Sequence, residues 1–289
     1  MKRVAVIGAA GQLGSALVKV LEERGLEPVP FTRGALDVCD HDGTKATLAE
    51  ARPDAVINTA AYLAVDLAED EVTQAFAVNA IAVKNLALVT AALDVPLVHV
   101  STDYVFGADA SRSTPYTETD APGPQGVYGN SKLAGEYFVR EYAPKHYVVR
   151  SAGLYETIGS RKKGGNFIET MLKLAAAGRS LKVVEDQVLT PTYTPDLAAA
   201  IVELLRTEAY GLYHATNGGD CSWYAFAGAI FELAGVEADL SPTTTAEYGA
   251  KAPRPAYSVL DNTKLHAAGV TPLRSWRDAL AAYLSRRNA

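Results

Sequence analysis

The sequence predicts an α/β protein built on a parallel sheet, with a second, smaller lobe toward its C-terminus. In the first half of the chain, short apolar runs alternate with longer stretches that have helical spacing. Strict alternation of strand and helix is typical of a parallel sheet with right-handed crossovers and helices on both faces. After Arg150 the alternation loosens, which indicates a different kind of packing in the second half.

The first strand and helix are the clearest elements. Val4 to Ile7 is apolar without polar alternation, as in a strand that is buried on both faces. Leu13, Leu17 and Leu21 then recur at helical spacing until Gly25, a residue type that commonly ends helices. In the rest of the first half we expect strands at 28–31, 55–58, 97–100 and 147–149, and helices at 67–92 and 131–142.

The second half contains fewer strands. We expect helices at 166–177, 196–205, 222–234 and 275–284, strands at 181–184 and 211–215, and a loop over the Thr-, Pro- and Ala-rich stretch 241–255. We therefore expect a dinucleotide-binding domain at 1–150, completed by parts of 181–215. Residues 151–289 would form mainly a substrate-binding lobe, with a cleft between the two.

Composition excludes several classes of protein. The 289 residues include 27 Lys and Arg against 33 Asp and Glu, a net charge of −6, so we expect no nucleic-acid partner. Cys39 and Cys221 cannot form a disulfide scaffold and lack metal-ligand spacing, so we expect reduced thiols and no metal site. No apolar run reaches the roughly 18 residues of a membrane span, and the N-terminus leads directly into the first strand. A cytoplasmic protein is the expectation.

A glycine-rich turn follows the first strand and opens the first helix. Gly8, Gly11 and Gly14 have the spacing G-x-x-G-x-x-G. In a dinucleotide fingerprint the first glycine permits the tight turn, the second lets the backbone approach the pyrophosphate, and the third lets the helix pack closely on the sheet. Exposed N–H groups at the helix N-terminus would then face the phosphates. The fold predicted is thus Rossmann-type and doubly wound; a glycine turn that binds nothing is the alternative.

The end of the second predicted strand bears on the choice of cofactor. An acidic residue there would bind the ribose hydroxyls of NAD, but this chain has Thr32 and Arg33. Arg33 could pair with a 2′-phosphate, which favours NADPH over NADH; a solvated surface arginine is the alternative. Asp37 and Val38 follow, where they could border the adenine ring.

Tyr128 and Lys132 lie four residues apart at the start of a predicted helix, on one face. A lysine ammonium beside a phenol would lower the tyrosine pKa, and such a tyrosine exchanges a proton with a carbonyl or an alcohol. The same lysine could bond a cofactor ribose. Thr102 and Asp103 close the strand at 97–100, at the edge where open α/β sheets bind ligands, and Thr102 could donate to a substrate oxygen.

These residues together resemble the extended short-chain dehydrogenase/reductases. The resemblance rests on the glycine turn, Thr59-Ala60-Ala61, Ser101-Thr102-Asp103-Tyr104-Val105-Phe106 and Tyr128-x-x-x-Lys132, and it covers nearly the whole chain. Val65-Asp66-x-Ala68-Glu69 and Arg254-Pro255 are similar to the dTDP-4-dehydrorhamnose reductase branch.

The resemblance implies hydride transfer from NADPH (or NADH) to the C4 ketone of a nucleotide-linked 6-deoxyhexulose, most simply dTDP-4-dehydro-L-rhamnose. Tyr128 would protonate the alkoxide, Thr102 would polarise the carbonyl, and Lys132 would hold the ribose. Gly11, Gln12 and Leu13 would contact the pyrophosphate. Asp103 would bind or help protonate the sugar, or else only cap a turn. Arg254 would bind the substrate diphosphate unless it is a solvated loop arginine. The stretch that lines the cofactor after the strand at 55–58 would be Ala60, Ala61, Tyr62 and Leu63.

Two departures from the branch concern the sugar. The family often has Thr-Ser-Trp after the arginine that matches Arg150, whereas this chain has Ser151-Ala152-Gly153, so Gly153 lines the sugar site without the tryptophan contact. Tyr62 stands where the family often has a histidine. A related ketosugar or another nucleotide carrier therefore stays open.

Two other functions are compatible with the same fold. An epimerase or dehydratase of the superfamily would hold NAD tightly and return the hydride to the sugar. A regulatory subunit would keep the fold and cofactor pocket without turnover, although it would have no chemical need for Tyr128, Lys132 and Thr102. A homodimer is a further possibility. The basic run Arg161-Lys162-Lys163 is expected to be a solvated loop, with steering of an anionic substrate as the alternative.

Overall fold

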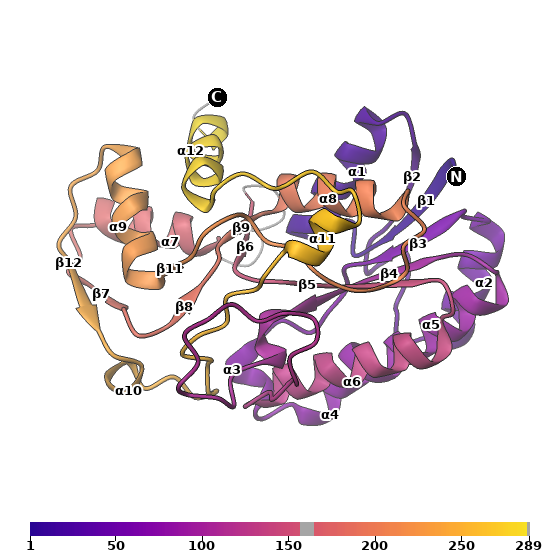
Figure 1. Cartoon of the computed structure of the whole chain (residues 1–289), viewed down its shortest axis with the longest axis horizontal. Helices are drawn as coiled ribbons and strands as arrows, with labels where there is room; N and C mark the ends of the chain where they lie inside the picture. Colours follow the sequence, from indigo (N-terminus) through magenta and orange to yellow (C-terminus); the bar gives the residue numbers. More distant parts are fainter. Residues whose placement is uncertain (157–164, 288–289) are drawn as a thin grey trace.

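The computed structural model describes residues 1–156 and 165–287, so the basic run Arg161-Lys162-Lys163 lies outside the described residues. Its centre is a six-stranded parallel sheet with the order β10-β5-β4-β3-β1-β2 (Figure 1). The strands are β1 (Arg3–Ile7), β2 (Glu27–Phe31), β3 (Ala55–Asn58), β4 (Leu97–Thr102), β5 (His146–Ser151) and β10 (Gly211–His214). The predicted doubly wound fold is confirmed.

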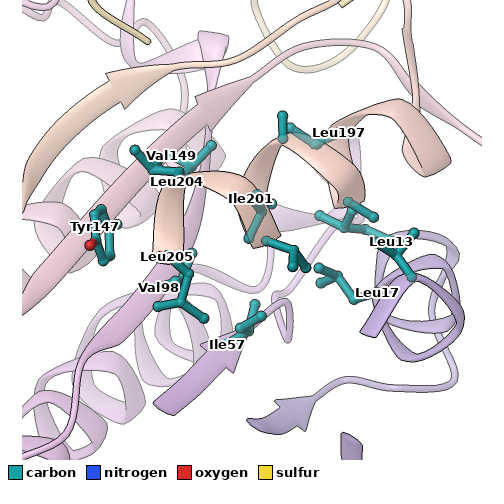
Figure 2. Close-up of a cluster of buried hydrophobic side chains, with 14 of the residues drawn as sticks. Leu13, Leu17, Ile57, Val98, Tyr147, Val149, Leu197, Ile201, Leu204 and Leu205 are labelled. Atoms are coloured by element: carbon teal, nitrogen blue, oxygen red, sulfur yellow. The ribbon is translucent and has the colours of Figure 1, made fainter. Parts of the chain in front are cut away.

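Helices cover both faces of this sheet, as the alternation of strand and helix requires. One face carries α1 (Gln12–Glu23), α8 (Thr194–Leu205) and α11 (Thr263–Ala267). The other carries α2 (His41–Ala51), α5 (Ala82–Ala92) and α6 (Val127–Tyr142). Figure 2 shows the core of the first face, where Leu13 and Leu17 of α1 and Ile201 of α8 meet Ile57 and Val98 of the sheet.

A second hydrophobic core lies in the C-terminal part of the chain, at the left of Figure 1. It is built on α7 (Phe167–Ala176), α9 (Trp223–Ala234) and α12 (Trp276–Arg287). Three short strand pairs frame it: β7 (Leu181–Val184) with β12 (Leu240–Thr243), β8 (Val188–Leu189) with β11 (Cys221–Ser222), and β6 (Leu154–Tyr155) with β9 (Thr192–Tyr193).

The predicted loop at 241–255 is wrong in its first part. Residues of this stretch form most of β12 and all of α10 (Thr245–Tyr248). β12 is a strand because it pairs in parallel with β7, some sixty residues earlier, and local composition does not encode such a pairing. The short helix α10 begins with a capping box in which Thr244 and Glu247 satisfy each other's backbone N–H groups.

The predicted helix at 67–92 is not continuous. The structure divides it into α3 (Val65–Ala68), α4 (Val72–Phe76), a π-helical turn η1 (Ala77–Ile81) and α5. Within the described chain, the run Val72–Ala92 is long and apolar enough to cross a membrane by length and composition. Half of it is buried inside the molecule, where α5 packs against α2 and α6, as a core helix does.

Candidate active site

The carboxyl ends of the parallel strands meet at one edge of the sheet and carry most of the predicted site residues. The strand order reverses its direction between β1 and β3, and ligands bind at such a switch point in open α/β sheets. The segments that lie at this edge are 8–14 after β1, 32–38 after β2, 59–63 after β3, 102–103 at the end of β4 and 151–153 at the end of β5.

The glycine turn is packed too closely for larger residues. Gly8 has a φ of +83°, and a Cβ added to it would lie 2.6 Å from Thr59 Oγ1. A Cβ on Gly14 would lie 2.2 Å from the carbonyl oxygen of Gly8, and one on Gly11 would lie 3.2 Å from the same oxygen. The turn therefore sits directly on the start of α1 and on the end of β3. The first turn of α1 has neither an acidic residue nor a side-chain cap, so its N–H groups can serve an anion.

Two buried polar atoms at this edge suit a dinucleotide. Gln12 Oε1 and Ser151 Oγ are buried, and neither has a hydrogen-bond partner among the described residues. Buried polar atoms nearly always have a partner, so unpaired ones at a ligand-binding edge mark positions where a bound molecule can supply it. Gln12 begins α1 and Ser151 ends β5, so the two atoms belong to elements on either side of the switch point. The residues present thus fit a cofactor laid along this edge.

The loop after β2 leaves Arg33 free. The carbonyl of Thr32 accepts from the N–H groups of Ala35 and Leu36, which forms a turn with Arg33 exposed at its tip. No hydrogen bond or ion pair holds the Arg33 side chain within the described part of the chain. The Asp37 side chain, in contrast, forms a hydrogen bond within its own loop, where its Oδ1 accepts from the N–H of Cys39 at 3.0 Å. Val38 is half-buried beside it.

The loop after β3 is held by Asn79, a residue that the sequence reasoning missed. Asn79 is fully buried in η1; its Oδ1 accepts from Tyr62 N at 2.8 Å, and its Nδ2 donates to Tyr62 O at 3.1 Å. Ala60, Ala61 and Tyr62 are half-buried, while Leu63 is 53% exposed. The π-helical turn aims Asn79 at this loop, and such turns leave no mark in hydrophobic periodicity.

Tyr128 is buried at the start of α6, with 8% of its surface exposed. Its ring makes an edge-on contact with Tyr104, with 5.7 Å between the centroids. Burial raises the pKa of Tyr128 well above its usual value, and the nearby charge of Asp103 raises it further, against a lowering hydrogen bond with Thr102. The phenol is therefore protonated at neutral pH.

Lys132 lies one turn after Tyr128 but turns toward β4. Its Nζ donates to Val100 O at 2.7 Å and lies 3.3 Å from His99 Nε2. Burial lowers the pKa of Lys132 to about 8. The expectation that Lys132 lowers the pKa of Tyr128 is therefore wrong for this structure, since burial outweighs any contribution from the lysine.

Thr102 and Asp103 form a buried pair at the end of β4. Thr102 Oγ1 donates to Asp103 Oδ1 at 3.0 Å, and Ser258 Oγ donates to Asp103 Oδ2 at 2.6 Å. Burial raises the pKa of Asp103 to about 6 in spite of these two donors. Ser258 was not singled out from the sequence, because only the tertiary structure brings it from a distant segment to this carboxyl.

Arg254 reaches the same region from the C-terminal part of the chain. Its guanidinium forms a two-point ion pair with Asp66, at 2.9 Å and 3.1 Å, and also donates to Ala252 O. It is therefore not the free loop arginine of the alternative interpretation. A phosphate that approached Arg254 would share it with the Asp66 carboxylate.

Comparison with known proteins gives a consistent result. The RmlD substrate binding domain family matches residues 1–288. The chain belongs to this family. It is 41% identical over 289 residues to the spore coat polysaccharide biosynthesis protein SpsK of Bacillus subtilis, covering 100% of this chain and 99% of that protein. It is 41% identical over 281 residues to a dTDP-4-dehydrorhamnose reductase of Mycolicibacterium smegmatis, covering 96% and 84%.

Solved structures agree with the assignment to the RmlD family. The crystal structure of dTDP-4-dehydrorhamnose reductase from Bacillus anthracis in complex with NADP superimposes with a TM-score of 0.93 at 38% identity, covering 99% of this chain and 100% of that one. The resemblance that the sequence motifs suggested is confirmed. A UDP-glucose 4-epimerase from Thermus thermophilus, at 23% identity, has a TM-score of 0.81, covers 99% of both chains and shares the fold alone.

In this RmlD family member the position of Gly153 is closed to a large side chain. Gly153 has a φ of +54°, and a Cβ there would meet Leu189 Cδ1 at 3.0 Å and Pro191 Cα at 3.1 Å. Any tryptophan at this position would need both a strained backbone and a displaced 189–191 segment. Gly153 therefore cannot offer a side-chain contact to a sugar, and the backbone of this turn is what it can present.

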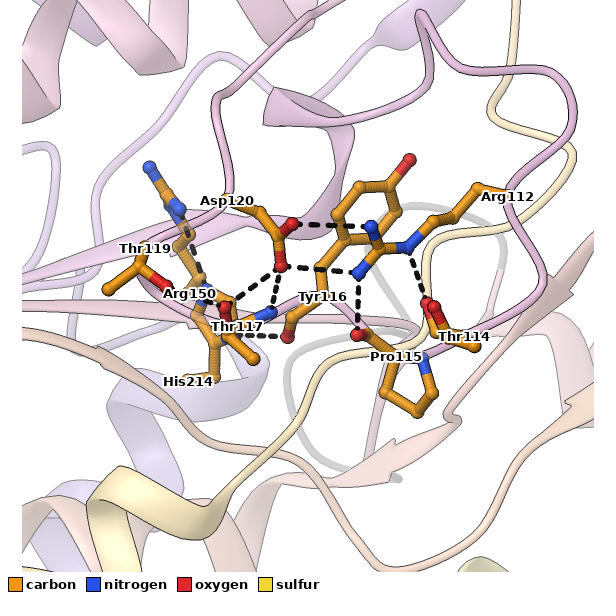
Figure 3. A network of polar contacts seen from close by, with 9 residues as sticks. All are labelled: Arg112, Thr114, Pro115, Tyr116, Thr117, Thr119, Asp120, Arg150 and His214. Atoms are coloured by element: carbon orange, nitrogen blue, oxygen red, sulfur yellow. Dashed lines mark hydrogen bonds and ion pairs between the residues drawn. The ribbon is translucent and has the colours of Figure 1, made fainter.

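A polar network fixes the loop between β4 and α6 of this RmlD family protein (Figure 3). Arg112 forms an ion pair with Asp120 at 3.2 Å and donates to the carbonyls of Thr114 and Pro115. His214 Nδ1 lies 3.0 Å from Tyr116 O, which joins the loop to β10. These contacts tie the 112–120 part of the loop that precedes Tyr128 to itself and to β10.

Proposed function

We propose that this protein reduces the C4 ketone of dTDP-4-dehydro-L-rhamnose to dTDP-L-rhamnose, with NADPH as the hydride donor. One observation carries this proposal. Tyr128 shares a hydrogen bond with Thr102, and Lys132 follows Tyr128 by one helical turn, in a chain that is about 40% identical to dTDP-4-dehydrorhamnose reductases over most of its length. The reaction needs a protonated acid beside a carbonyl, and the raised pKa of Tyr128 supplies one.

The cofactor would lie along the carboxyl edge of the sheet and supplies the hydride when bound. The pyrophosphate would be held by the turn and helix start at Gly8, Gly11, Gln12, Leu13 and Gly14. Arg33, with Thr32, would bind the 2′-phosphate that distinguishes NADPH from NADH. Asp37 and Val38 would flank the adenine, while Ala60, Ala61, Tyr62 and Leu63 would line the path toward the nicotinamide. Lys132 would bond the ribose.

The substrate would be held between this edge and the C-terminal part of the chain. Tyr128 donates its phenolic proton to the forming alkoxide, and Thr102 polarises the carbonyl by a hydrogen bond. Asp103 binds a sugar hydroxyl and holds the Thr102 hydroxyl in place. Arg254 binds the diphosphate, its guanidinium oriented by Asp66. The turn at Gly153 offers only backbone to the sugar.

Partners, location and domain division complete the proposal. We infer a cytoplasmic enzyme whose partner is a nucleotide sugar, with neither a nucleic acid nor a membrane involved. A dinucleotide-binding domain at 1–150, completed by parts of 181–215, would face a substrate lobe in 151–289. β10 supports that completion because it pairs with β5.

A homodimer is proposed from exposed apolar side chains on α4, η1, α5 and α6, namely Val72, Ile81, Leu88 and Tyr137.

The deciding experiment follows NADPH absorbance after the protein is mixed with dTDP-4-keto-6-deoxyglucose, with and without the 3,5-epimerase. Oxidation only in the presence of the epimerase is the expected result. Oxidation without the epimerase would point to a reductase for another stereoisomer. No oxidation across a panel of nucleotide ketosugars, with NADPH bound, would contradict the proposal. Tightly copurified NAD without net turnover would point instead to an epimerase or dehydratase.

A further inference from the structure

Three buried side chains, which end at Lys132, form a line of polar contacts near the carboxyl edge of the sheet. Asn58 at the end of β3, His99 in the middle of β4 and Lys132 on α6 are each at most 2% exposed. Asn58 Nδ2 lies 3.2 Å from His99 Nδ1, and His99 Nε2 lies 3.3 Å from Lys132 Nζ. The roles proposed above for the catalytic and cofactor-binding groups use Lys132 but leave Asn58 and His99 unexplained.

Hydrogen-bond polarity fixes which nitrogen of His99 carries the proton. Asn58 Oδ1 accepts from the backbone N–H of Ala60 at 3.1 Å, and a backbone N–H can only donate. The amide group of Asn58 must therefore direct its NH₂ toward His99. His99 Nδ1 then has to accept, so the single proton of the neutral ring lies on Nε2. A doubly protonated ring would set Nδ1–H against the Asn58 NH₂, and burial lowers the pKa of His99 well below its usual value.

This tautomer presents an N–H to Lys132. An ammonium group has only donors, so it would face the Nε2–H of His99 without an acceptor. A neutral amine accepts from Nε2–H and still donates to Val100 O, where the distance is 2.7 Å. On the other side, Glu136 lies one turn further along α6, and its charge favours the ammonium. Glu136 is itself paired with Arg150 of β5 at 2.6 Å, which reduces that effect.

We propose that Asn58 and His99 are positioning residues that set the protonation of Lys132: they favour its neutral amine while the side chain points at His99. The ammonium form is favoured only when the side chain turns to an acceptor elsewhere. On the proposed function, on which this part rests, that acceptor is a ribose hydroxyl of the dinucleotide. At pH values around and above the Lys132 midpoint, cofactor binding would then be accompanied by proton uptake at Lys132.

Two substitutions reverse the polarity without touching Lys132. His99→Gln places an uncharged amide beside Lys132 that can turn its oxygen toward an ammonium. Asn58→Asp places a carboxylate opposite His99 Nδ1, which draws the ring proton to Nδ1 and leaves Nε2 as an acceptor for an ammonium. Both should raise the pKa of Lys132. His146→Gln is the matched control, because His146 contacts the carbonyl of Ala143 at the start of β5.

The test is an NMR titration of protein carrying ¹³C at the lysine Cε, without cofactor, with Lys132→Met used to assign the signal. We expect wild-type Lys132 to titrate near pH 8. In His99→Gln and Asn58→Asp the midpoint should rise by about one pH unit or more, a tenfold change in proton affinity, while His146→Gln should match wild type. If one of the two variants fails to fold, the remaining variant decides, since both are expected to shift the midpoint in the same direction.

A wild-type Lys132 that titrates at the ordinary lysine value, or variants that titrate with wild type, would overturn the proposal. A merely structural role for His99 would lower the melting temperature without moving this midpoint upward. A second measurement, NADPH fluorescence against pH, separates this inference from the proposed function. We expect wild-type affinity to weaken above the Lys132 midpoint, and His99→Gln to displace that loss to higher pH. If the Lys132 midpoint shifts in the variants but the protein binds no NADPH, the hydrogen-bond polarity inferred for Asn58 and His99 would stand. The proposed reductase function would then be refuted.

Discussion

The Glu69 carboxylate accepts a hydrogen bond at 2.9 Å from the backbone N–H of Val127, the first residue of the helix that carries Tyr128. Glu69 and Asp66 both lie in or beside α3, and Asp66 binds Arg254. One short segment thus contacts both the helix that carries Tyr128, the proposed acid, and the side chain of Arg254, the residue proposed to bind the diphosphate. This explains in physical terms why the pattern Val65-Asp66-x-Ala68-Glu69 accompanies the Tyr128 and Arg254 positions.

Removal of the Glu69 carboxylate should loosen the start of α6. For Glu69→Ala we expect a loss of about 1 kcal/mol in the free energy of unfolding, the usual effect of losing a helix cap. We also expect a several-fold lower kcat, because Tyr128 follows the capped N–H directly. Urea unfolding and steady-state kinetics measure the two effects. Glu141→Ala, on the exposed last turn of the same helix, is the control; equal effects of both substitutions would dismiss the capping role.

Loss of the Tyr128 hydroxyl should remove the proton donor. Tyr128→Phe is expected to lower kcat about a hundredfold or more, the scale of general acid catalysis, with little change in NADPH affinity. Stopped-flow measurement of hydride transfer separates chemistry from product release. The exposed Tyr137 on the same helix serves as the control, as Tyr137→Phe. An unchanged rate in Tyr128→Phe would remove this residue from the mechanism.

Arg33 should distinguish the two dinucleotides. Arg33→Ala is expected to weaken NADPH binding by about tenfold or more, since a charge-assisted pair with the 2′-phosphate is lost, and to leave NADH nearly unaffected. Fluorescence titration with both cofactors gives the two dissociation constants. Lys45→Ala, an exposed cation on α2, controls for the general loss of positive charge. Equal losses for NADPH and NADH would place Arg33 away from the phosphate.

The free energy of unfolding should depend on the ionisation of Asp103. Its folded pKa, about 6, lies above the ordinary value of 3.8, so the folded protein keeps this proton after the unfolded chain has lost it. Stability contributed by this group is therefore lost as the pH rises from about 4 through 6. Asp103→Asn should remove that loss and raise the free energy of unfolding by up to about 3 kcal/mol above pH 6. Melting temperatures of both proteins between about pH 4 and 8 test this; parallel curves would contradict it.

Arg254 should act on the nucleotide sugar rather than on the cofactor. Arg254→Gln is expected to raise the KM for the substrate by about tenfold and to leave the NADPH dissociation constant unchanged. Lys251→Gln provides a nearby control, because Lys251 lies on the same loop as Arg254 but forms an exposed ion pair with Asp70. The proposed diphosphate contact would be excluded if the two variants had the same KM.

Sequence alone determined the sheet and the position of its functional edge. Val4 to Ile7, 55–58 and 97–100 are apolar runs typical of buried strands, and the spacing of Gly8, Gly11 and Gly14 predicts a tight turn after the first of them. These features are local: apolar runs, a left-handed φ and helical spacing are all encoded within a few neighbouring residues. The pair Tyr128 and Lys132 could be predicted from the sequence for the same reason, since residues one helical turn apart lie on one face.

Only the tertiary structure decided what surrounds these residues. Asn79 reaches Tyr62 through a π-helical turn, Ser258 reaches Asp103 from 155 residues away, and β12 becomes a strand only against β7. It also decided that burial, and not Lys132, governs the pKa of Tyr128. Desolvation and long-range strand pairing depend on which distant segments pack together, and the periodicity of a single sequence does not encode those contacts.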